Sequence, residues 1–302
     1  MVRCPCMPHS TWTAPVISVL NLKGGVGKTH TSWLLASVAQ ERGDRILLID
    51  LDTQANLTRS FLDTVAPEQS VAELFNPAAE VEAAGIVHHT NFSHIDLIPS
   101  VPQLSTFDES AQVRWEETDS HFALVDPLEQ LRSQYDLIVV DCPPRLSLVS
   151  FAALCAADFV IIPLEAADWG AQGVTQVAEA VRYVQSRYNA KLELLGYLVS
   201  RFKRARAFQQ TYWKKLRHHF GRLAFDTAIP DLARFEQSVT ERVPITLHSK
   251  GSIEAGIARR LYAEVQRRIS RSKRTRGSRS KQGLSNASNA CLLYTSPSPR
   301  DS

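Results

Sequence analysis

The 302-residue chain has few cysteines and no long apolar run. No stretch of 18 consecutive apolar residues occurs, so we expect no membrane span. Residues 1–15 lack the apolar core of a secretion signal, which argues against export. The five cysteines have neither metal-ligand spacing nor the pattern of a disulfide framework, which fits a reducing compartment. These absences disfavour secreted scaffolds and integral membrane proteins, and predict a cytoplasmic protein.

Charge is distributed unevenly along the chain. The whole sequence carries 34 Lys and Arg against 31 Asp and Glu, a formal net charge of +3. Residues 1–200 carry 12 basic and 24 acidic side chains, whereas residues 201–281 carry 21 and 6. A basic end on an acidic body favours a polyanionic partner, with a merely solvated basic surface as the alternative.

The most specific motif is a glycine-rich loop, Lys-Gly-Gly-Val-Gly-Lys-Thr, at residues 23–29. An apolar run precedes it and a helical pattern follows to about Arg42, which is the context that a phosphate-binding loop requires. The glycines allow successive backbone N–H groups to point at an anion, and the helix start adds its positive dipole end. Lys28 can reach the outer phosphates, and Thr29 can offer its hydroxyl to Mg²⁺.

Two further apolar runs end in aspartate. Residues 45–49 lead into Asp50, with Asp52 two positions later, and residues 137–140 lead into Asp141. Open α/β sheets bind ligands at the carboxyl ends of their strands. A carboxylate after a central strand can order Mg²⁺ opposite a phosphate loop. Together with the loop, these aspartates predict a site for a nucleotide and Mg²⁺.

The remainder of the chain alternates between buried strands and helices. We expect further strands at residues 95–98, 159–164 and 192–199, and helices at residues 124–134, 147–157, 173–188 and 253–269. This alternation predicts an α/β fold with a single doubly wound, mostly parallel sheet and helices on both of its faces.

Three segments together resemble the ParA/MinD class of P-loop ATPases, which has a deviant Walker A motif. They are the loop at residues 23–29, the Asp-x-Asp-x-Gln run at 50–54, and Asp-Cys-Pro-Pro at 141–144. Thr53 stands where the family has proline. The resemblance covers about residues 16–268 and is nearest to the short, Soj-like ParA form, since no helix-turn-helix segment precedes the loop.

The resemblance implies the following site. Lys23, Lys28 and Asp52 would be catalytic, with Lys23 crossing a dimer interface to the partner's nucleotide. ATP would contact Gly24, Gly25, Val26, Gly27, Lys28, Thr29 and His30, with Pro230 and Asp231 near the adenine. Mg²⁺ would be held by Thr29, Asp50 and Asp141.

The resemblance also implies a function. The ATP-bound homodimer would bind double-stranded DNA without sequence preference, and a ParB-like partner would stimulate hydrolysis and release. Plasmid or chromosome DNA would be segregated in this way, in the cytoplasm at the nucleoid. Candidate DNA contacts are Arg201, Lys203, Arg204, Arg206, Lys214, Lys215, Arg259, Arg260, Arg267 and Arg268.

Four segments are expected in the chain. Residues 1–15 would be an N-terminal extension, residues 16–269 the ParA-like ATPase domain, and residues 270–290 a disordered basic tail. Residues 291–302 look like a translated sequencing adapter and are set aside.

Three other functions stay open at this point. The ATPase could position a protein cargo rather than DNA. It could dock on a membrane as MinD does, through the narrow apolar seam of the last helix. A synthetase or amidotransfer enzyme on this fold would leave the basic C-terminal part unexplained.

Overall fold

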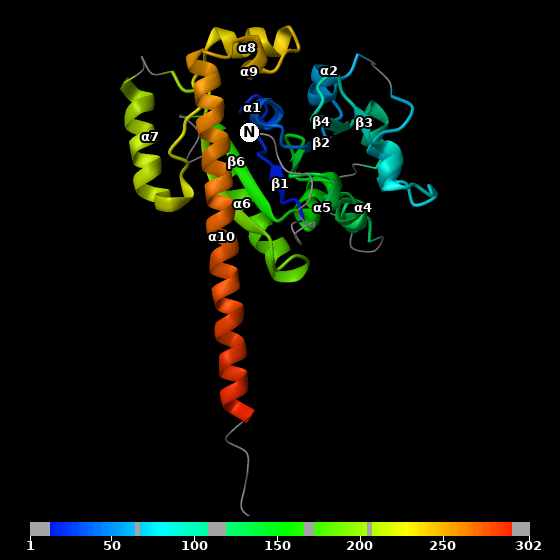
Figure 1. Ribbon diagram of the computed structural model, residues 1–302, viewed down its shortest axis with the longest axis vertical. Coiled ribbons are helices and arrows are strands. Elements are labelled where there is room, and N and C mark those ends of the chain that lie inside the picture. The colour runs from blue at the N-terminus through cyan, green and yellow to red at the C-terminus, as the bar shows by residue number, and fades with distance from the viewer. Residues whose placement is uncertain (1–12, 64–66, 108–118, 166–171, 204–206, 292–302) are drawn as a thin grey trace, which may run out of the picture.

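A seven-stranded sheet organises the chain in the computed structural model, which describes residues 13–63, 67–107, 119–165, 172–203 and 207–291 (Figure 1). The strand order is β3-β4-β2-β5-β1-β6-β7, and all pairs are parallel except β3 with β4. The strands are β1 Val16–Val19, β2 Ile46–Asp50, β3 His88–His89, β4 Ile95–Ile98, β5 Leu137–Asp141, β6 Phe159–Glu165 and β7 Glu193–Ser200. Most of these strands are continuous apolar runs, which is typical of strands whose side chains are buried on both faces of the sheet.

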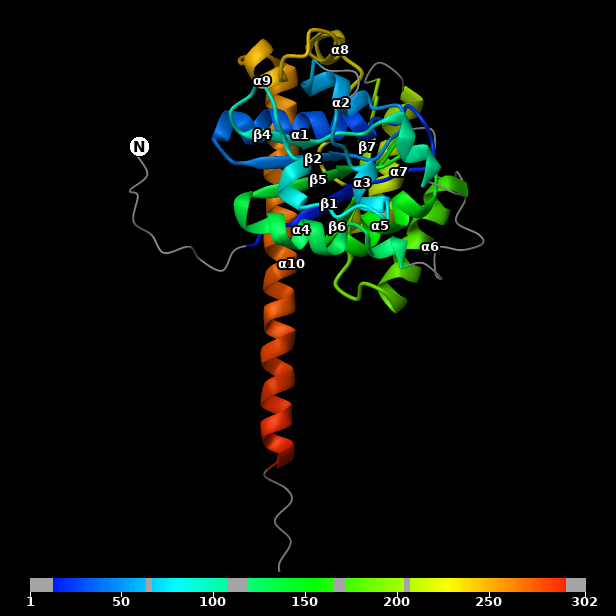
Figure 2. The ribbon, with the colours of Figure 1, turned by 90° about the vertical axis from the view of Figure 1, so that its right-hand side faces the viewer.

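Helices cover both faces of this sheet (Figure 2). The α-helices are α1 Lys28–Arg42, α2 Asn56–Phe61, α3 Ala72–Phe75, α4 Val125–Leu131, α5 Leu148–Ala156, α6 Gln172–Arg187, α7 Ala207–Phe220, α8 Ala233–Thr240, α9 Ile245–His248 and α10 Ile253–Cys291. Short 3₁₀ turns are η1 Ala83–Ile86, η2 Pro102–Thr106, η3 Ser120–Phe122, η4 Arg132–Gln134 and η5 Gly221–Leu223.

Alternate residues of the central strands enter two separate cores. Val16 and Ile138 face the core formed with α3 to α7, whereas Ile17 and Val139 face the core formed with α1, α2 and α8 to α10. This period-two division is the expected consequence of a pleated strand buried on both faces. The prediction of a doubly wound, mostly parallel sheet is confirmed.

The edge strand β3 was not predicted from the sequence. His88 pairs with Leu97 and His89 with Asp96 in antiparallel register. The side chain of His89 also contacts Asp96, with Nδ1 2.7 Å from Oδ1. A two-residue strand leaves no periodic pattern, so only its pairing with β4 defines it.

The last helix is longer than expected. α10 continues to Cys291, so residues 270–290, expected to be disordered, are helical in the structure (Figure 1). No proline interrupts this segment, and helical hydrogen bonds are local, so the helix extends beyond its packed part. Of the expected extension at 1–15 and the expected adapter segment at 291–302, residues 1–12 and 292–302 lie outside the described residues.

The apolar seam of α10 belongs to the core. Ile257, Leu261, Val265 and Ile269 are all buried, in the same cluster as the buried residues of α1. A seam covered by α1 has no apolar face left for a membrane, which removes the observation that supported a MinD-like function. Among the described helices, none combines the length and apolarity needed to cross a bilayer.

Candidate functional site

The phosphate-binding loop joins β1 to α1. Gly25 and Gly27 have φ angles of 76° and 85°, the left-handed region that favours glycine. A Cβ atom on Gly27 would lie 3.2 Å from Ser200 Oγ, so this position also lacks space for a side chain. The Ser200 hydroxyl donates to the carbonyl of Val26 and ties the loop to the end of β7.

Lys28 is curled inside its own loop. Its Nζ donates to the carbonyl of Lys23 at 3.2 Å, and the residue is 7% exposed. Burial lowers the pKa of Lys28, whereas the nearby carboxylates of Asp141 and Asp52 raise it. The ammonium group therefore lies in the loop that would surround phosphate oxygens, as the motif predicts.

Asp50 and Asp141 lie side by side, in register on β2 and β5. Asp50 is saturated with donors: Oδ2 accepts from the Thr58 amide and hydroxyl, both at 2.8 Å, and Oδ1 accepts from the Asp52 amide at 3.0 Å. Burial raises the pKa of Asp50 to about 6 in spite of these donors. Asp50 thus fixes the loop after β2, which fits a supporting role near a metal better than direct coordination.

Asp141 has the opposite environment. Both of its carboxylate oxygens are buried, and neither has a hydrogen-bond partner among the described residues. Burial, and then the neighbouring Asp50, raise the pKa of Asp141 well above its usual range, while Thr29 and Lys28 oppose the change. Within the described part of the chain, only Thr29 and Lys28 offset the burial of this carboxylate and the charge of Asp50, so a cation beside it would stabilise the ionised form.

The donor set fits Mg²⁺. Asp141 offers free carboxylate oxygens and Thr29 a hydroxyl, and Mg²⁺ prefers such hard oxygen ligands. Of the three predicted metal residues, the structure therefore favours Thr29 and Asp141 as direct ligands. Asp50 lies beside Asp141 on the next strand, and its oxygens already accept three hydrogen bonds.

A cavity of about 720 Å³ opens in front of the loop. It brings together nine of the predicted site residues: Gly24, Gly25, Gly27, Lys28, Thr29, His30, Asp52, Pro230 and Asp231. Val26 is buried and does not line the cavity, and its carbonyl accepts a hydrogen bond from the Ser200 hydroxyl. The volume is within the range of small-molecule sites.

His30 and Phe235 close one side of this cavity. Their rings meet edge to face with centroids 4.9 Å apart. Burial, and then the nearby Arg201, lower the pKa of His30 to about 4, so the imidazole is neutral near pH 7. Its buried Nε2 has no partner among the described residues.

Lys23 lies outside the cavity. Its Nζ is 3.1 Å from Glu165 Oε2 at the end of β6, and half of its side chain is exposed. This placement leaves the ammonium group at the molecular surface.

Arg201 was predicted to contact DNA, but the structure places it at the cavity. Its Nη1 lies 3.4 Å from the Gly25 carbonyl oxygen, and its backbone has a left-handed φ of 51°. Leu232 and Phe235 of the same cavity were also missed. The sequence carried no signal for them, because only the tertiary fold brings the end of β7 and the start of α8 to the loop.

Two other predicted DNA contacts are used within the fold. Arg259 forms a bidentate pair with Glu41 of α1, with both N–O distances 2.7 Å. The guanidinium of Arg268 donates to Glu264 and to the carbonyls of Leu195, Arg222 and Ala224. Arg268 is therefore a structural residue rather than a free surface cation.

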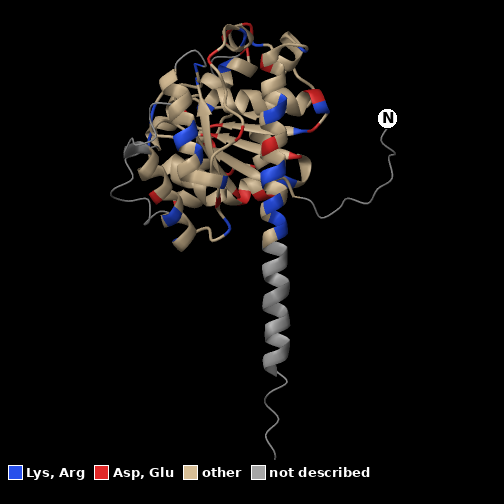
Figure 3. Cartoon of the chain, turned by 90° about the vertical axis from the view of Figure 1, so that its left-hand side faces the viewer, with Lys and Arg blue, Asp and Glu red and all other residues tan. Residues whose placement is uncertain are grey.

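The other candidates are divided. Lys203 pairs with Asp231, with Nζ 3.1 Å from Oδ2. Four further candidates are exposed on α7 and α10: Lys214, Lys215, Arg260 and Arg267. Lysine and arginine side chains recur along the described part of α10 (Figure 3). Arg204 and Arg206 lie outside the described residues.

Sequence relatives agree with this geometry. A family model described as an AAA domain (AAA_31) matches residues 14–194. The chromosome-partitioning ATPase Soj of Thermus thermophilus is 33% identical, covering 84% of this chain and 96% of that protein. The sporulation initiation inhibitor protein Soj of Bacillus subtilis is 31% identical, covering 83% of this chain and 97% of that protein.

A solved structure agrees as well. Cobyrinic acid a,c-diamide synthase from Mycobacterium smegmatis, with a bound ATP analogue and magnesium, is 28% identical with a TM-score of 0.66. The match covers 72% of this chain and 88% of that one. From the phosphate loop, the strand-end aspartates and the full-length Soj relatives, we conclude that the chain belongs to the ParA/Soj family of P-loop ATPases.

Proposed function

We propose that the chain is a partition ATPase that binds ATP and Mg²⁺ at the loop of residues 23–29 and hydrolyses ATP as a dimer. The observation that carries this proposal is the buried carboxylate of Asp141, which lies beside Asp50 and, among the residues described, is offset only by Thr29 and Lys28. The relatives' printed role in chromosome partitioning supports the same function.

The residues have separate roles in this reaction. The loop amides and Lys28 stabilise negative charge that develops on the phosphate oxygens. Thr29 and Asp141 hold Mg²⁺, which supplies further positive charge when it is bound. Asp52, at the edge of the cavity, orients the attacking water and accepts its hydrogen bond.

The exposed position of Lys23 supports the dimer. We propose that Lys23 leaves Glu165 and contacts the nucleotide of the partner subunit. Each active site then consists of Lys28 and Asp52 from one subunit and Lys23 from the other.

DNA is the proposed ligand of the ATP-bound dimer. Lys214 and Lys215 of α7 and Arg260 and Arg267 of α10 are exposed and can meet phosphates without reading bases. A ParB-like protein would stimulate hydrolysis and release the dimer from DNA. The protein would then associate with the nucleoid and segregate plasmid or chromosome DNA.

A subunit-mixing experiment tests the composite active site. Lys23→Ala and Asp52→Ala chains are each expected to be inactive alone. In the mixed dimer, the subunit that lacks its own Lys23 keeps Asp52 and receives Lys23 from its partner, so one intact site forms. ATP hydrolysis should therefore reappear on mixing. If the mixture stays as inactive as the separate variants while dimers form, Lys23 does not act across the interface.

A further inference from the structure

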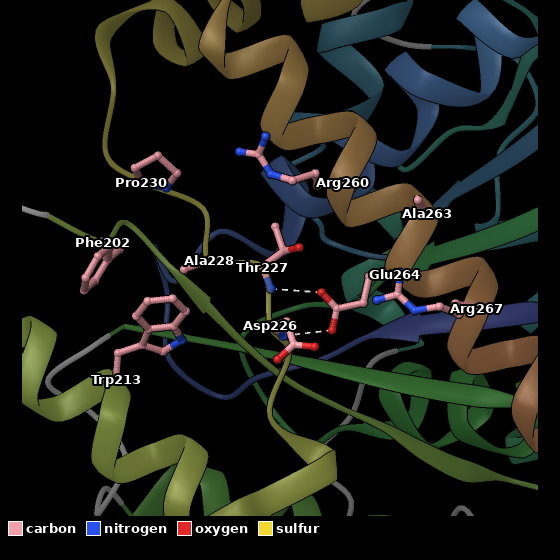
Figure 4. A pocket seen from close by; sticks show the side chains of 10 residues that line it. All are labelled: Phe202, Trp213, Asp226, Thr227, Ala228, Pro230, Arg260, Ala263, Glu264 and Arg267. Atoms are coloured by element: carbon pink, nitrogen blue, oxygen red, sulfur yellow. Dashed lines mark hydrogen bonds between the residues drawn. The ribbon is translucent and has the colours of Figure 1, made fainter.

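A second cavity, of about 320 Å³, lies between α7 and α10 (Figure 4). Phe202 and Trp213 form one wall, and Arg260 and Arg267 extend from α10 on the other side. Pro230 lines both this cavity and the nucleotide cavity, so the chain segment around it separates the two. The second cavity is therefore a neighbour of the ATP site and not a part of it.

The two arginines of this cavity have no partner among the described residues. Arg260 and Arg267 are exposed and are seven positions apart, which places them two turns apart on one side of the helix, about 10 Å along its axis. Arg259 and Arg268, one position away from each, are both used by intramolecular pairs. The two cations that face the cavity are thus available to a ligand.

The acids of the cavity are already compensated. Glu264 accepts from the backbone amides of Asp226 and Thr227, at 2.8 and 2.9 Å, and from Arg268. Asp226 in turn pairs with Arg217, with Nη2 2.5 Å from Oδ1. With both carboxylates paired, the positive charge of Arg260 and Arg267 dominates the space.

The aromatic wall carries a donor without an acceptor. The rings of Phe202 and Trp213 lie 5.6 Å apart at an interplanar angle of 53°. Trp213 Nε1 is buried and has no acceptor among the described residues. Leaving a buried donor unpaired costs about 1–3 kcal/mol, so an acceptor from outside this part of the chain would stabilise it.

We propose that this cavity binds a nucleoside phosphate. Its base packs on Phe202 and Trp213 and offers a ring acceptor to Trp213 Nε1, while its phosphate pairs with Arg260 and Arg267. Base–aromatic contacts of this kind contribute about 1–3 kcal/mol per base. The volume is at the lower end of small-molecule sites and suits one nucleotide.

A nucleoside phosphate could reach this cavity either as a free nucleotide or as part of a DNA strand, and both present the same base and phosphate groups. A base inside a duplex is stacked and paired, so the occupant is either a free nucleotide or an unpaired nucleotide of a DNA strand. The site therefore goes beyond ATP binding at the phosphate loop and beyond contacts with the backbone of duplex DNA.

The test uses the full chain saturated with ADP and Mg²⁺, so that the phosphate loop is occupied. Thymidine 5′-monophosphate and 5′-phosphorylated pentathymidylate are titrated, and binding is followed by tryptophan fluorescence and by calorimetry. The double variant Arg260→Gln/Arg267→Gln removes the cations of the cavity. Arg271→Gln/Arg274→Gln removes the same charge from exposed positions of the same helix that do not line the cavity.

We expect saturable binding of one probe molecule per chain. It should weaken at least tenfold in Arg260→Gln/Arg267→Gln and in Trp213→Ala, and stay within twofold in Arg271→Gln/Arg274→Gln. Binding of both probes assigns the site to free nucleotides, and binding of pentathymidylate alone assigns it to unpaired strands. ADP affinity in each variant shows that the fold is intact.

Three results would overturn the proposal. The first is the absence of saturable binding by either probe. The second is an equal loss in the two charge variants, which would reduce the effect to diffuse electrostatic attraction. The third is inorganic phosphate binding as tightly as thymidine 5′-monophosphate, which would show that the base makes no contact.

Discussion

Lys23 Nζ lies 3.1 Å from Glu165 Oε2, so the lysine expected to serve a second subunit is held by an acid of its own chain. Glu165 ends β6, and about a third of its side chain is exposed. This pair must separate before Lys23 can reach a partner's nucleotide. The intramolecular contact thus competes with the dimer.

Removing this competitor should favour the dimer. Because exposed ion pairs contribute about 0.2–1 kcal/mol each and two of them separate per dimer, Glu165→Gln should lower the dimer dissociation constant in ATP by about two- to thirtyfold. Analytical ultracentrifugation with ATP and Mg²⁺ measures it. Glu179→Gln, on the exposed face of α6, removes the same charge without touching Lys23 and serves as the control. An unchanged or weaker dimer in Glu165→Gln would contradict the competition.

Asp141 and Asp50 should respond in opposite ways to loss of charge. Asp141→Asn removes a buried carboxylate that is destabilised by desolvation and by the neighbouring Asp50, so the ligand-free protein should unfold at a higher temperature. Asp50→Asn weakens three hydrogen bonds and should unfold at a lower temperature. Scanning calorimetry without nucleotide compares them. Loss of stability in both variants would show that Asp141 has a partner.

The same two variants separate the metal roles. Asp141→Asn should abolish the gain in ATP affinity that Mg²⁺ provides, because its oxygens are direct ligands. Asp50→Asn should retain part of that gain, because it acts through the loop after β2. ATP titrations with Mg²⁺ and with EDTA measure the difference. Full Mg²⁺ dependence in Asp141→Asn would exclude Asp141 as a ligand.

The loop lysine and the cavity aspartate should also differ. Lys28→Ala removes the ammonium group inside the loop and should lose nucleotide binding or turnover. Asp52→Ala should bind ATP normally but trap the dimer on DNA, since only water positioning is lost. Equilibrium binding and single-turnover hydrolysis distinguish these outcomes. Rapid hydrolysis by Asp52→Ala would remove its catalytic role.

The bidentate pair between Arg259 and Glu41 should stabilise the fold in a pH-dependent way. The Arg259 side chain lowers the pKa of Glu41 below its unfolded value of about 4.3. The stabilisation is therefore fully present above that value and is lost as the pH falls through the lower folded pKa.

Arg259→Ala should accordingly lower the free energy of unfolding by about 1 kcal/mol at pH 7, and by less as the pH falls through the folded pKa of Glu41. Urea unfolding at several pH values measures this change. Arg271→Ala, an exposed arginine of the same helix, should change it little at any pH. A pH-independent loss in Arg259→Ala would assign the effect to packing rather than to charge.

The local motifs of the site were predictable. Lys28 and Thr29 follow their glycines directly, and Asp141 ends an apolar run, so nearby residues alone determine their chemistry. Most strands were predicted for the same reason, since each is a continuous apolar run. Pro230 and Asp231 came from the family resemblance and do line the nucleotide cavity.

What could not be predicted depends on distant contacts. Arg201 belongs to a basic stretch and resembles its neighbours, yet the end of β7 brings it to the Gly25 carbonyl. Arg259 and Arg268 cannot be told from Arg260 and Arg267 by sequence, because their partners are on α1 and near the start of β7. Arginines on the side of α10 that packs against α1 and β7 find partners there, whereas Arg260 and Arg267 lie on the exposed side.

The most direct test of the proposed function is duplex DNA binding with Mg²⁺ and either ATP or ADP, over a salt series. We predict that binding requires ATP and that the logarithm of the association constant falls linearly with the logarithm of salt concentration, with a slope of about 0.9 per phosphate contact. Equal binding with ATP and ADP would show that the basic surface attracts DNA regardless of the bound nucleotide, which would contradict a nucleotide-controlled switch. No binding with either nucleotide would contradict the account and favour a protein cargo.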